Sequence, residues 1–524
     1  MKLFIPIVQV LDRYKIRDID ILDGKDSTSR YTQLYQLLRS GELKTDEEVA
    51  KHFYGDSANL MDPKFRAFKS AFKDRLLNTL FFIDPSHTQF TDFQGAYYAA
   101  QREWGAIRIL YARNLISPAT ELAERLLVVC IKYELTELCV SILDKLRSSY
   151  ASQIGDKKKY EWYKSLFWSY KGLSDAEHLA QDAFEELQIE YVKTTAFRPE
   201  NSTIAEGKLE RLLPLHAQYD SFMFRFYFYG VKEAVFSAKH DYPGVIDVCN
   251  EALAYFRHKP FTMKAYIAIF LNQKVIAHLS LRQYGACQQV LDEVLHIQEV
   301  GNVNWFKSME KKVILGFHMG DYALAHAAYS EASDQKEFKN LQDQSADVWK
   351  LFEAYLFWAN SIGKPMGFGK GGQTKLDKFR LWTFLNDVPT FSDDKRGMNI
   401  PVLVVQIALM ISLRKNTLLD KRIETIEKYL FRYARRADAA KYRTNLFIRL
   451  LLEIPRCHMN SQALEKRTTL ILSNLKKVPL HVISTGYQME IIPYEVLWLE
   501  LIKMTDLNAK QSASARNRVE SRTT

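Results

Sequence analysis

The chain has 524 residues, of which 47% are hydrophobic and 26% are charged, and its formal net charge is +10. This composition excludes wholesale disorder, and the length exceeds what one compact core holds, so the sequence favours several domains or a repeat array. Only 21 glycines and 14 prolines interrupt the chain, which favours an all-α fold of long helices with short connections over a sheet-rich fold.

The first apolar run, residues 3–11, contains Pro6 and Gln9 and is not followed by a small-residue cleavage site. We therefore do not expect it to be a signal peptide. No stretch reaches the roughly 20 apolar residues of a membrane-spanning helix, so no membrane contact is expected. The five cysteines are scattered without a C-x-x-C pair, which fits buried thiols in a reducing compartment. The sequence predicts a soluble cytoplasmic protein.

Residues 1–90 are expected to form a small helical unit. Thr45 and Glu48 have the spacing of a capping box for a helix over residues 46–54, and another helix is expected from Pro63 onward. The outer face of that last helix is basic: Lys64, Arg66, Lys69, Lys73 and Arg75. Two interpretations remain open, a helical cap for a repeat array and a winged-helix-like DNA-binding unit.

Residues 91–358 are expected to consist of helical hairpins. Residues 119–132 and 135–147 are predicted to pair as one hairpin, and residues 162–171 and 176–186 as another. A loop is expected over residues 194–207. After it, one sequence pattern recurs, beginning at Tyr242, Tyr284 and Tyr322, which are separated by 42 and 38 residues. Small or apolar residues follow each tyrosine 3, 7 and 10 positions later, a spacing that lines one face of a helix.

The copy with Tyr322, Ala325, Tyr329 and Ala332 resembles the second helix of the tetratricopeptide repeat family. The two earlier copies are similar, so the resemblance is clearest over residues 209–341. It implies an α-α superhelix of antiparallel helix pairs, flanked here by atypical helical end domains. It also implies a concave groove that binds a protein or peptide.

On this basis we expect the chain to be a non-enzymatic scaffold or adaptor. Four polar residues on the presumed first helices of the pairs are candidates for contacting the partner: Asn272, Lys274, Lys307 and Lys311. The sequence does not give the identity of the partner or the oligomeric state.

Residues 359–398 are predicted to form a loop region rich in glycine and lysine. Gly367, Gly369 and Gly372 have the G-x-G-x-x-G spacing, but the dinucleotide fingerprint also requires a preceding strand. A helix is expected before them instead. We predict a connecting loop and no cofactor.

The segment 399–505 is expected to be a basic helical block, followed by a disordered tail over residues 506–524. From Ser361 onward the chain has 28 basic and 15 acidic residues, so the whole positive excess lies there. Four basic residues lie close together at helical spacing: Lys428, Arg432, Arg435 and Arg436. They support an alternative function, a nucleic-acid-associated regulator that binds phosphates through this block or through the N-terminal unit.

No catalytic constellation is visible. The twelve histidines form neither an H-E-x-x-H motif nor a pair four residues apart that could hold a metal ion. We therefore predict no enzyme activity and no metal site.

Overall fold

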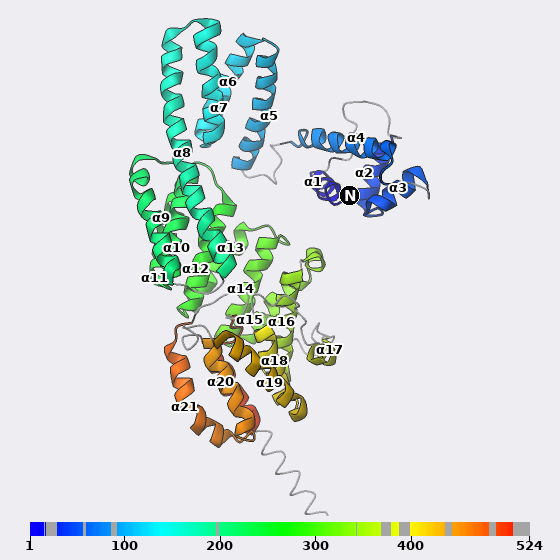
Figure 1. The fold of residues 1–524 in the computed structure, drawn as a ribbon, viewed down its shortest axis with the longest axis vertical. Coiled ribbons are helices and arrows are strands. Elements are labelled where there is room, and N and C mark those ends of the chain that lie inside the picture. Colours follow the sequence, from blue (N-terminus) through cyan, green and yellow to red (C-terminus); the bar gives the residue numbers. More distant parts are fainter. Residues whose placement is uncertain are drawn as a thin grey trace, which may run out of the picture. The chain divides into compact units, whose positions relative to one another are not determined.

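The structure, a computed structural model, describes residues 1–14, 16, 29–55, 59–84, 92–194, 199–341, 343–367, 379–386, 399–434, 443–480 and 489–506. It divides into two compact units, Met1–Ser174 and Asp175–Thr524. The division falls inside helix α8 (Lys157–Thr194). The described part of both units contains helices and no strand, so the predicted all-α fold is confirmed (Figure 1).

The first unit begins with four short helices: α1 (Phe4–Arg13), α2 (Arg30–Ser40), α3 (Asp46–Tyr54) and α4 (Pro63–Leu80). Their apolar faces form one hydrophobic cluster that includes Phe4, Leu34, Val49, Phe65 and Phe72. The predicted capping box is present, because the Thr45 hydroxyl accepts the Glu48 N–H at 3.2 Å and the Glu48 carboxylate accepts the Thr45 N–H at 3.0 Å. The two helices predicted here are confirmed.

The remainder of the first unit consists of α5 (Asp92–Ala112), α6 (Ile116–Lys132), α7 (Thr136–Ser149), the π-helix η1 (Tyr150–Ile154) and the start of α8. The contact between α6 and α7 confirms the first predicted hairpin. The second predicted hairpin is wrong, because α8 continues without a break through Gly172 and Ser174. A glycine in a helix interior costs only about 1 kcal/mol relative to alanine, so the helix can run through it.

The second unit contains the tyrosine repeats. It includes α9 (Pro199–Gln218), α10 (Phe222–Ala238), α11 (Tyr242–Arg257), α12 (Lys264–Ser280), α13 (Tyr284–Ile297), α14 (Val303–Met319), α15 (Tyr322–Ser333), η2 (Lys336–Asn340) and α16 (Asp343–Ser361). Each helix from α9 to α16 packs against the next one in the chain. The loop predicted over residues 194–207 is largely wrong, because α9 begins at Pro199, a residue that suits the first turn of a helix.

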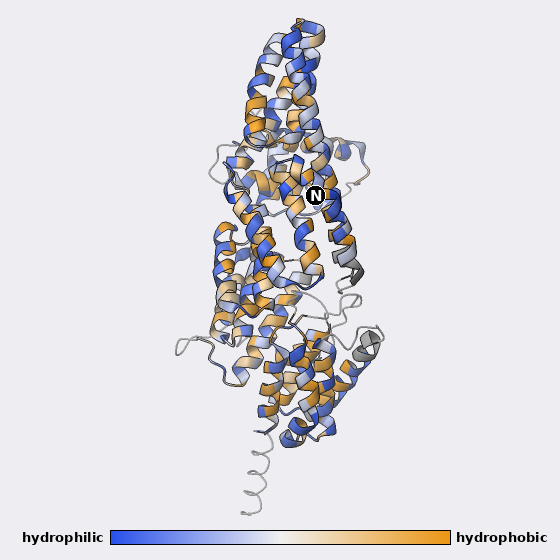
Figure 2. Cartoon of the chain, turned by 90° about the vertical axis from the view of Figure 1, so that its left-hand side faces the viewer, coloured by the Kyte–Doolittle hydropathy of each residue, from blue (hydrophilic) through white to orange (hydrophobic). Residues whose placement is uncertain are grey.

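The three repeat tyrosines are the first residues of α11, α13 and α15. The nine residues predicted to line one face are all buried: Val245, Cys249, Ala252, Cys287, Leu291, Val294, Ala325, Tyr329 and Ala332. Figure 2 shows hydrophobic and hydrophilic residues interspersed along the helical ribbons of the chain, as expected for amphipathic helices. The predicted periodicity therefore describes the packed faces correctly.

A common turn precedes each of these helices. The residue two positions before each tyrosine has a positive φ: 55° at His240, 59° at Arg282 and 72° at Gly320. The same left-handed residue occurs before α6 and α7 in the first unit, at Asn114 and Glu134. Since a left-handed residue ends one helix and lets the next begin within two residues, it keeps neighbouring helices antiparallel and close.

The chain continues through α17 (Leu381–Asn386), α18 (Asn399–Ser412), α19 (Asn416–Ala434), α20 (Arg443–Arg456), α21 (Ser461–Lys477) and a last helix over residues 494–506. This C-terminal block packs through α18 against α16. Most of the predicted loop region 359–398 and nearly all of the predicted tail lie outside the described residues.

Two further features bear on function. None of the described helices is long and apolar enough to cross a membrane. All five cysteines are buried, and none of them forms a disulfide.

Candidate functional site

The four predicted groove residues lie on two helices that contact each other. Asn272 and Lys274 are on α12, and Lys307 and Lys311 are on α14. All four are partly exposed. Although α13 lies between them in the chain, α12 also contacts α14 directly. The structure therefore places the predicted candidates on neighbouring helices.

Asn272 lies where α12 and α14 meet. Its side-chain amide donates to the Ala268 carbonyl at 2.8 Å, and the Ser308 hydroxyl lies 3.5 Å from its Oδ1. Ser308 is fully buried, and its hydroxyl also donates to the Asn304 carbonyl at 3.2 Å. Asn272 is therefore held in place from both helices.

Lys307 has a structural partner that the sequence did not reveal. Its Nζ lies 2.9 and 3.0 Å from the two carboxylate oxygens of Glu310, one turn further along α14. Glu310 is 0% exposed, and burial raises the pKa of this carboxyl in spite of the lysine. Lys307 thus compensates a buried acid as well as facing the surface.

Lys311 is in a different position. Its Nζ donates to the Lys307 carbonyl at 3.2 Å, and among the described residues it has no carboxylate within ion-pair distance. Burial lowers the pKa of Lys311 to about 8, although the nearby Glu310 carboxylate opposes the shift and the charge of Lys307 adds to it.

Helix α10 contributes another buried acid, Glu233, which is 7% exposed and accepts the hydroxyl of Ser237. Burial raises the pKa of Glu233 to about 7. Glu233 and Glu310 were missed from the sequence because isolated glutamates in helices are usually solvated. The available signal was their position in strongly apolar stretches, such as the aromatic-rich segment before Glu233.

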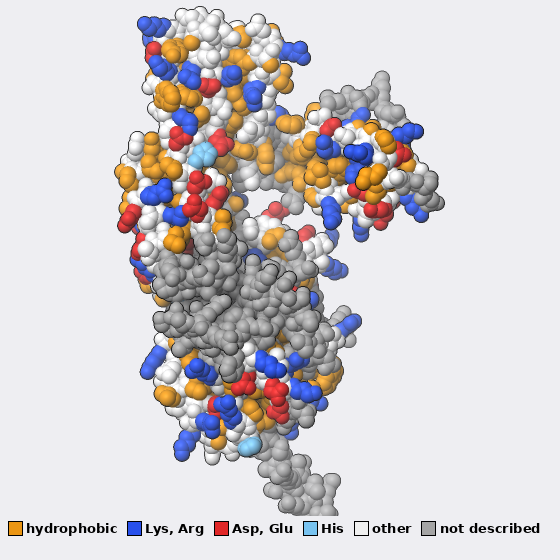
Figure 3. Space-filling model, viewed as in Figure 1, with side chains coloured by type: hydrophobic (Ala, Val, Ile, Leu, Met, Phe, Trp, Pro, Cys, Tyr) orange, Lys and Arg blue, Asp and Glu red, His pale blue; other side chains and the backbone are white. Residues whose placement is uncertain are grey.

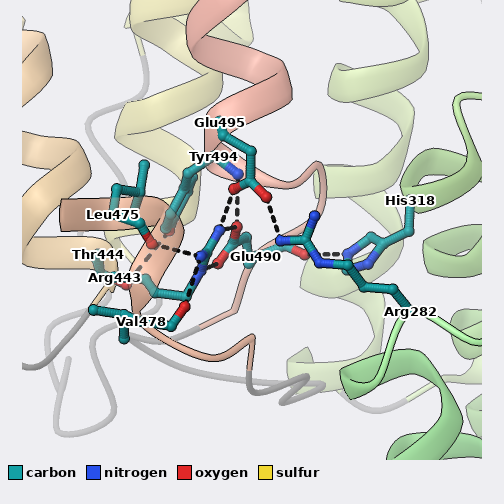
Figure 4. Close-up of polar contacts among 9 residues, drawn as sticks. All are labelled: Arg282, His318, Arg443, Thr444, Leu475, Val478, Glu490, Tyr494 and Glu495. Atoms are coloured by element: carbon teal, nitrogen blue, oxygen red, sulfur yellow. Dashed lines mark hydrogen bonds and ion pairs between the residues drawn. The ribbon is translucent and has the colours of Figure 1, made fainter. Parts of the chain in front are cut away.

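A second polar site lies inside the C-terminal block, centred on Arg443 at the start of α20 (Figure 4). Its guanidinium donates to both oxygens of Glu490, at 2.9 and 2.8 Å, and to Glu495. It also donates to the carbonyls of Leu475 and Val478 at the end of α21, at 2.9 and 3.0 Å. All five N–H groups of Arg443 therefore have acceptors. Although burial opposes it, the contacts with Glu490 and Glu495 raise the pKa of Arg443.

This site continues to the repeat helices. Glu495 also accepts from Arg282, the left-handed residue between α12 and α13, and the ring of His318 on α14 donates from Nε2 to the Glu490 carbonyl at 2.9 Å. His318 Nδ1 is buried without a partner among the described residues, and burial lowers the pKa of His318 to about 4. We call Arg282, His318, Arg443, Glu490 and Glu495 the arginine network. It fixes the C-terminal block to the ends of two repeat helices.

Most of the four basic residues predicted to bind nucleic acid near α19 have side chains outside the described part of the structure. Lys428 is exposed on α19. The helical backbone is described at Arg432 but not its side chain, and Arg435 and Arg436 lie outside the described residues. Figure 3 shows basic side chains interspersed with acidic ones over the C-terminal part of the visible face.

The basic face of α4 in the first unit is partly engaged within the fold. Lys69 Nζ lies 2.8 Å from Asp46 Oδ2, and the Arg75 guanidinium lies 4.4 Å from the centre of the Tyr31 ring. Lys73 Nζ also lies 3.7 Å from Asp74 Oδ1, so three of the five cations predicted for a nucleic-acid contact have partners within the unit.

The described part of the chain contains no group of three His, Cys, Asp or Glu side chains that could hold a metal ion. Of the glycine motif only Gly367 is described, and α16 precedes it, so the expected helix is confirmed. No protein-family model matches the chain, and no curated protein matches it significantly.

Proposed function

We propose that this protein is a non-enzymatic scaffold that binds an acidic peptide segment of a partner protein on the faces of α10, α12 and α14. The observation that carries the proposal is the set of partly exposed polar side chains on α12 and α14, led by Lys311. This amine has no carboxylate partner among the described residues.

The packing of the helices supports a curved array with these faces inside. The contact between α12 and α14 is more extensive than any between α11 and α13 or between α13 and α15. In a stack of helix pairs, the helices that approach each other more closely line the concave side. A tetratricopeptide-like superhelix has this arrangement and uses it to bind extended segments.

The charges of alternate helices support an acidic ligand. Helix α12 carries Lys264 and Lys274 and no Asp or Glu, whereas α13 carries Asp292 and Glu293 and no Lys or Arg. Helix α14 is also basic, and α15 has Glu331 as its one charged residue. Segregation of this kind attracts carboxylates to one side of the array and repels them from the other.

The structure determines which substitutions test this. Lys307→Ala is unsuitable, because it would leave the buried Glu310 without its cation and destabilise the fold. Lys274 and Lys311 form no ion pair within the described part of the chain, so Lys274→Ala and Lys311→Met leave Glu310 paired with Lys307. Asp292→Asn on α13 is the matched control, because Asp292 is exposed on a second helix.

The experiment selects peptides from a random-sequence display library on the purified protein and measures their affinity by fluorescence anisotropy. We expect acidic peptides, a loss of about tenfold or more in affinity for Lys274→Ala and Lys311→Met, and no change for Asp292→Asn. The melting temperature should be the same in all variants. Selected peptides that bind both lysine variants with unchanged affinity would refute the proposal.

A second candidate function, nucleic-acid binding through the C-terminal block, rests on the excess of basic residues after Ser361 and on exposed lysines such as Lys428, Lys476 and Lys477. Binding of labelled single- and double-stranded DNA and RNA, measured from about 50 to about 500 mM salt, should weaken steeply as salt increases. The triple variant Arg432→Glu, Arg435→Glu, Arg436→Glu should abolish it. Absence of binding at low salt, or unchanged binding by this variant, would exclude this use of α19.

A further inference from the structure

A groove runs between α21 and the last helix, residues 494–506. It has a volume of about 580 Å³, and the residues that line it include Glu465, Thr469, Leu472 and Lys476 of α21 and Trp498 and Leu499 of the last helix. The Ser461 hydroxyl donates to Asp506, which ties the start of α21 to the end of the last helix. The groove is therefore preformed by helices held together at one end.

The floor of the groove is apolar and its ends are charged. Trp498 is fully buried and Ile502 is 6% exposed, whereas Leu499 is 46% exposed at the edge. Glu465 lies toward the start of α21 and Lys476 at its end, and neither has an ion-pair partner among the described residues. The surface thus offers one apolar strip between an unpaired anion and an unpaired cation.

The spacing of these residues makes the strip complementary to itself. Glu465, Thr469, Leu472 and Lys476 are separated by 4, 3 and 4 residues, so they share one face of α21. If two such helices lie antiparallel around a two-fold axis, the residue numbers of facing positions have a constant sum. The register that pairs Glu465 with Lys476 of the other copy also pairs Thr469 with Leu472, and both pairs occur twice.

We propose that the occupant of this groove is α21 of a second copy of this chain, and that the protein forms a two-fold symmetric dimer through α21 and the last helix. Two Glu465–Lys476 ion pairs close the ends of the interface, and Leu472 and Leu499 of both copies cover its centre. Because the same patch serves on both copies, the contact is closed and does not extend into a filament.

Charge complementarity favours a second copy over an unrelated helix. The same face of α21 carries both Glu465 and Lys476, so in a dimer each of these charges meets the opposite charge of the other copy. The apolar area is small, so we expect a reversible dimer with a dissociation constant on the order of micromolar rather than an obligate one. The inference does not depend on peptide binding by α10, α12 and α14.

The test measures the mass of the full-length protein by sedimentation equilibrium from about 1 to about 200 μM, at low and high salt. The wild type should shift from monomer to dimer, less readily at high salt. Glu465→Lys places like charges together twice in a homodimer, as does Lys476→Glu, so each should raise the dissociation constant by about tenfold or more. Lys466→Glu is the matched control, because Lys466 is exposed on the same helix and does not line the groove.

Mixing the two charge-reversal variants tests the antiparallel register directly. Glu465→Lys and Lys476→Glu each associate with themselves more weakly than the wild type, but a heterodimer of the two again contains two opposite-charge pairs. An equimolar mixture should therefore recover the dimer, and so should the double variant alone. Circular dichroism and melting temperature confirm that each chain is folded.

A wild type that stays monomeric throughout would overturn the proposal and leave the groove to a helix of another protein. A dimer that persists in both single variants would place the contact elsewhere. Failure of the mixture to recover a dimer that each single variant has lost would exclude the antiparallel register.

Discussion

Arg443 and Glu490 form a doubly hydrogen-bonded ion pair inside the C-terminal block, with N–O distances of 2.9 and 2.8 Å and side-chain exposures of 5% and 3%. The two residues are 47 positions apart in the chain. Through Glu495 and the Glu490 carbonyl, the same pair reaches Arg282 and His318 on the repeat helices. The network thus joins the repeat helices of the second unit to its C-terminal block, which the sequence presents as separate segments.

Removing the arginine should destabilise the second unit strongly. In Arg443→Met the carboxylates of Glu490 and Glu495 remain buried without their shared cation, and two carbonyls at the end of α21 lose their donor. We expect the free energy of unfolding to fall by about 3–5 kcal/mol. Urea unfolding followed by circular dichroism measures this.

The control for that prediction is Arg467→Met on α21. Arg467 also pairs with a glutamate, Glu453, but its own side chain is 57% exposed, and Arg456 stays paired with the same carboxylate. Solvent screening limits the loss there to about 1 kcal/mol. Equal effects of the two substitutions would show that burial does not set the strength of the Arg443 contacts.

His318 should make stability depend on mildly acidic pH. Its pKa is about 4 in the folded protein against an ordinary value of 6.5, chiefly because it is buried. As pH falls, the unfolded chain takes up this proton first, so stability is complete above pH 6.5 and is lost as pH falls toward 4. His318→Gln keeps an N–H donor for Glu490 without titrating.

The stability difference between wild type and His318→Gln should therefore shrink by up to about 3 kcal/mol between pH 7.5 and pH 4.5. Urea unfolding at several pH values gives this difference. A constant difference would show that the folded protein accepts the proton at His318 as readily as the unfolded chain.

Glu233 should act in the opposite direction over the same range. Burial raises its pKa from 4.5 to about 7, so the folded protein holds this proton more tightly than the unfolded chain. Its contribution is favourable below pH 4.5 and is lost as pH rises through 7. Glu233→Gln keeps the neutral shape and removes the charge.

Relative to the wild type, Glu233→Gln should be more stable at pH 8 than at pH 5 by about 2–3 kcal/mol. Because Lys274 lies on the neighbouring α12 and Ser237 donates to Glu233, the measurement should be repeated in Lys274→Ala. A larger gain at pH 8 in this background would mean that Lys274 compensates part of the Glu233 charge in the wild type.

The local elements could be predicted from the sequence. The capping box at Thr45 depends on residues three positions apart, and the buried faces behind Tyr242, Tyr284 and Tyr322 follow from the helical period. The errors were local as well. Gly172 and Pro199 resemble loop residues, but one is tolerated within a helix and the other suits its first turn.

The sites were predictable only in part. The helices that carry Asn272, Lys274, Lys307 and Lys311 could be placed from the repeat register, whereas contact of these residues with a partner stays a prediction. The arginine network could not be predicted, since Arg282 and Glu495 are 213 residues apart and nothing in either segment indicates the other. The role of Lys307 also depends on the burial of Glu310, which only packing determines.

The close approach of α14 and α15 gives a final prediction. A Cβ atom on Gly316 would lie 2.6 Å from the backbone nitrogen of Ala325, so any side chain forces the two helices apart. Gly316→Ala should therefore lower the free energy of unfolding by about 1–3 kcal/mol. Gly285→Ala, on α13, meets no atom within 4 Å and should raise it by about 0.5–1 kcal/mol, because alanine is the better helix former. The opposite signs separate the contact from helix propensity. If both substitutions were stabilising, α14 and α15 could move apart with little loss of packing energy, and neither Gly316 nor Ala325 would need to be small for the two helices to pack.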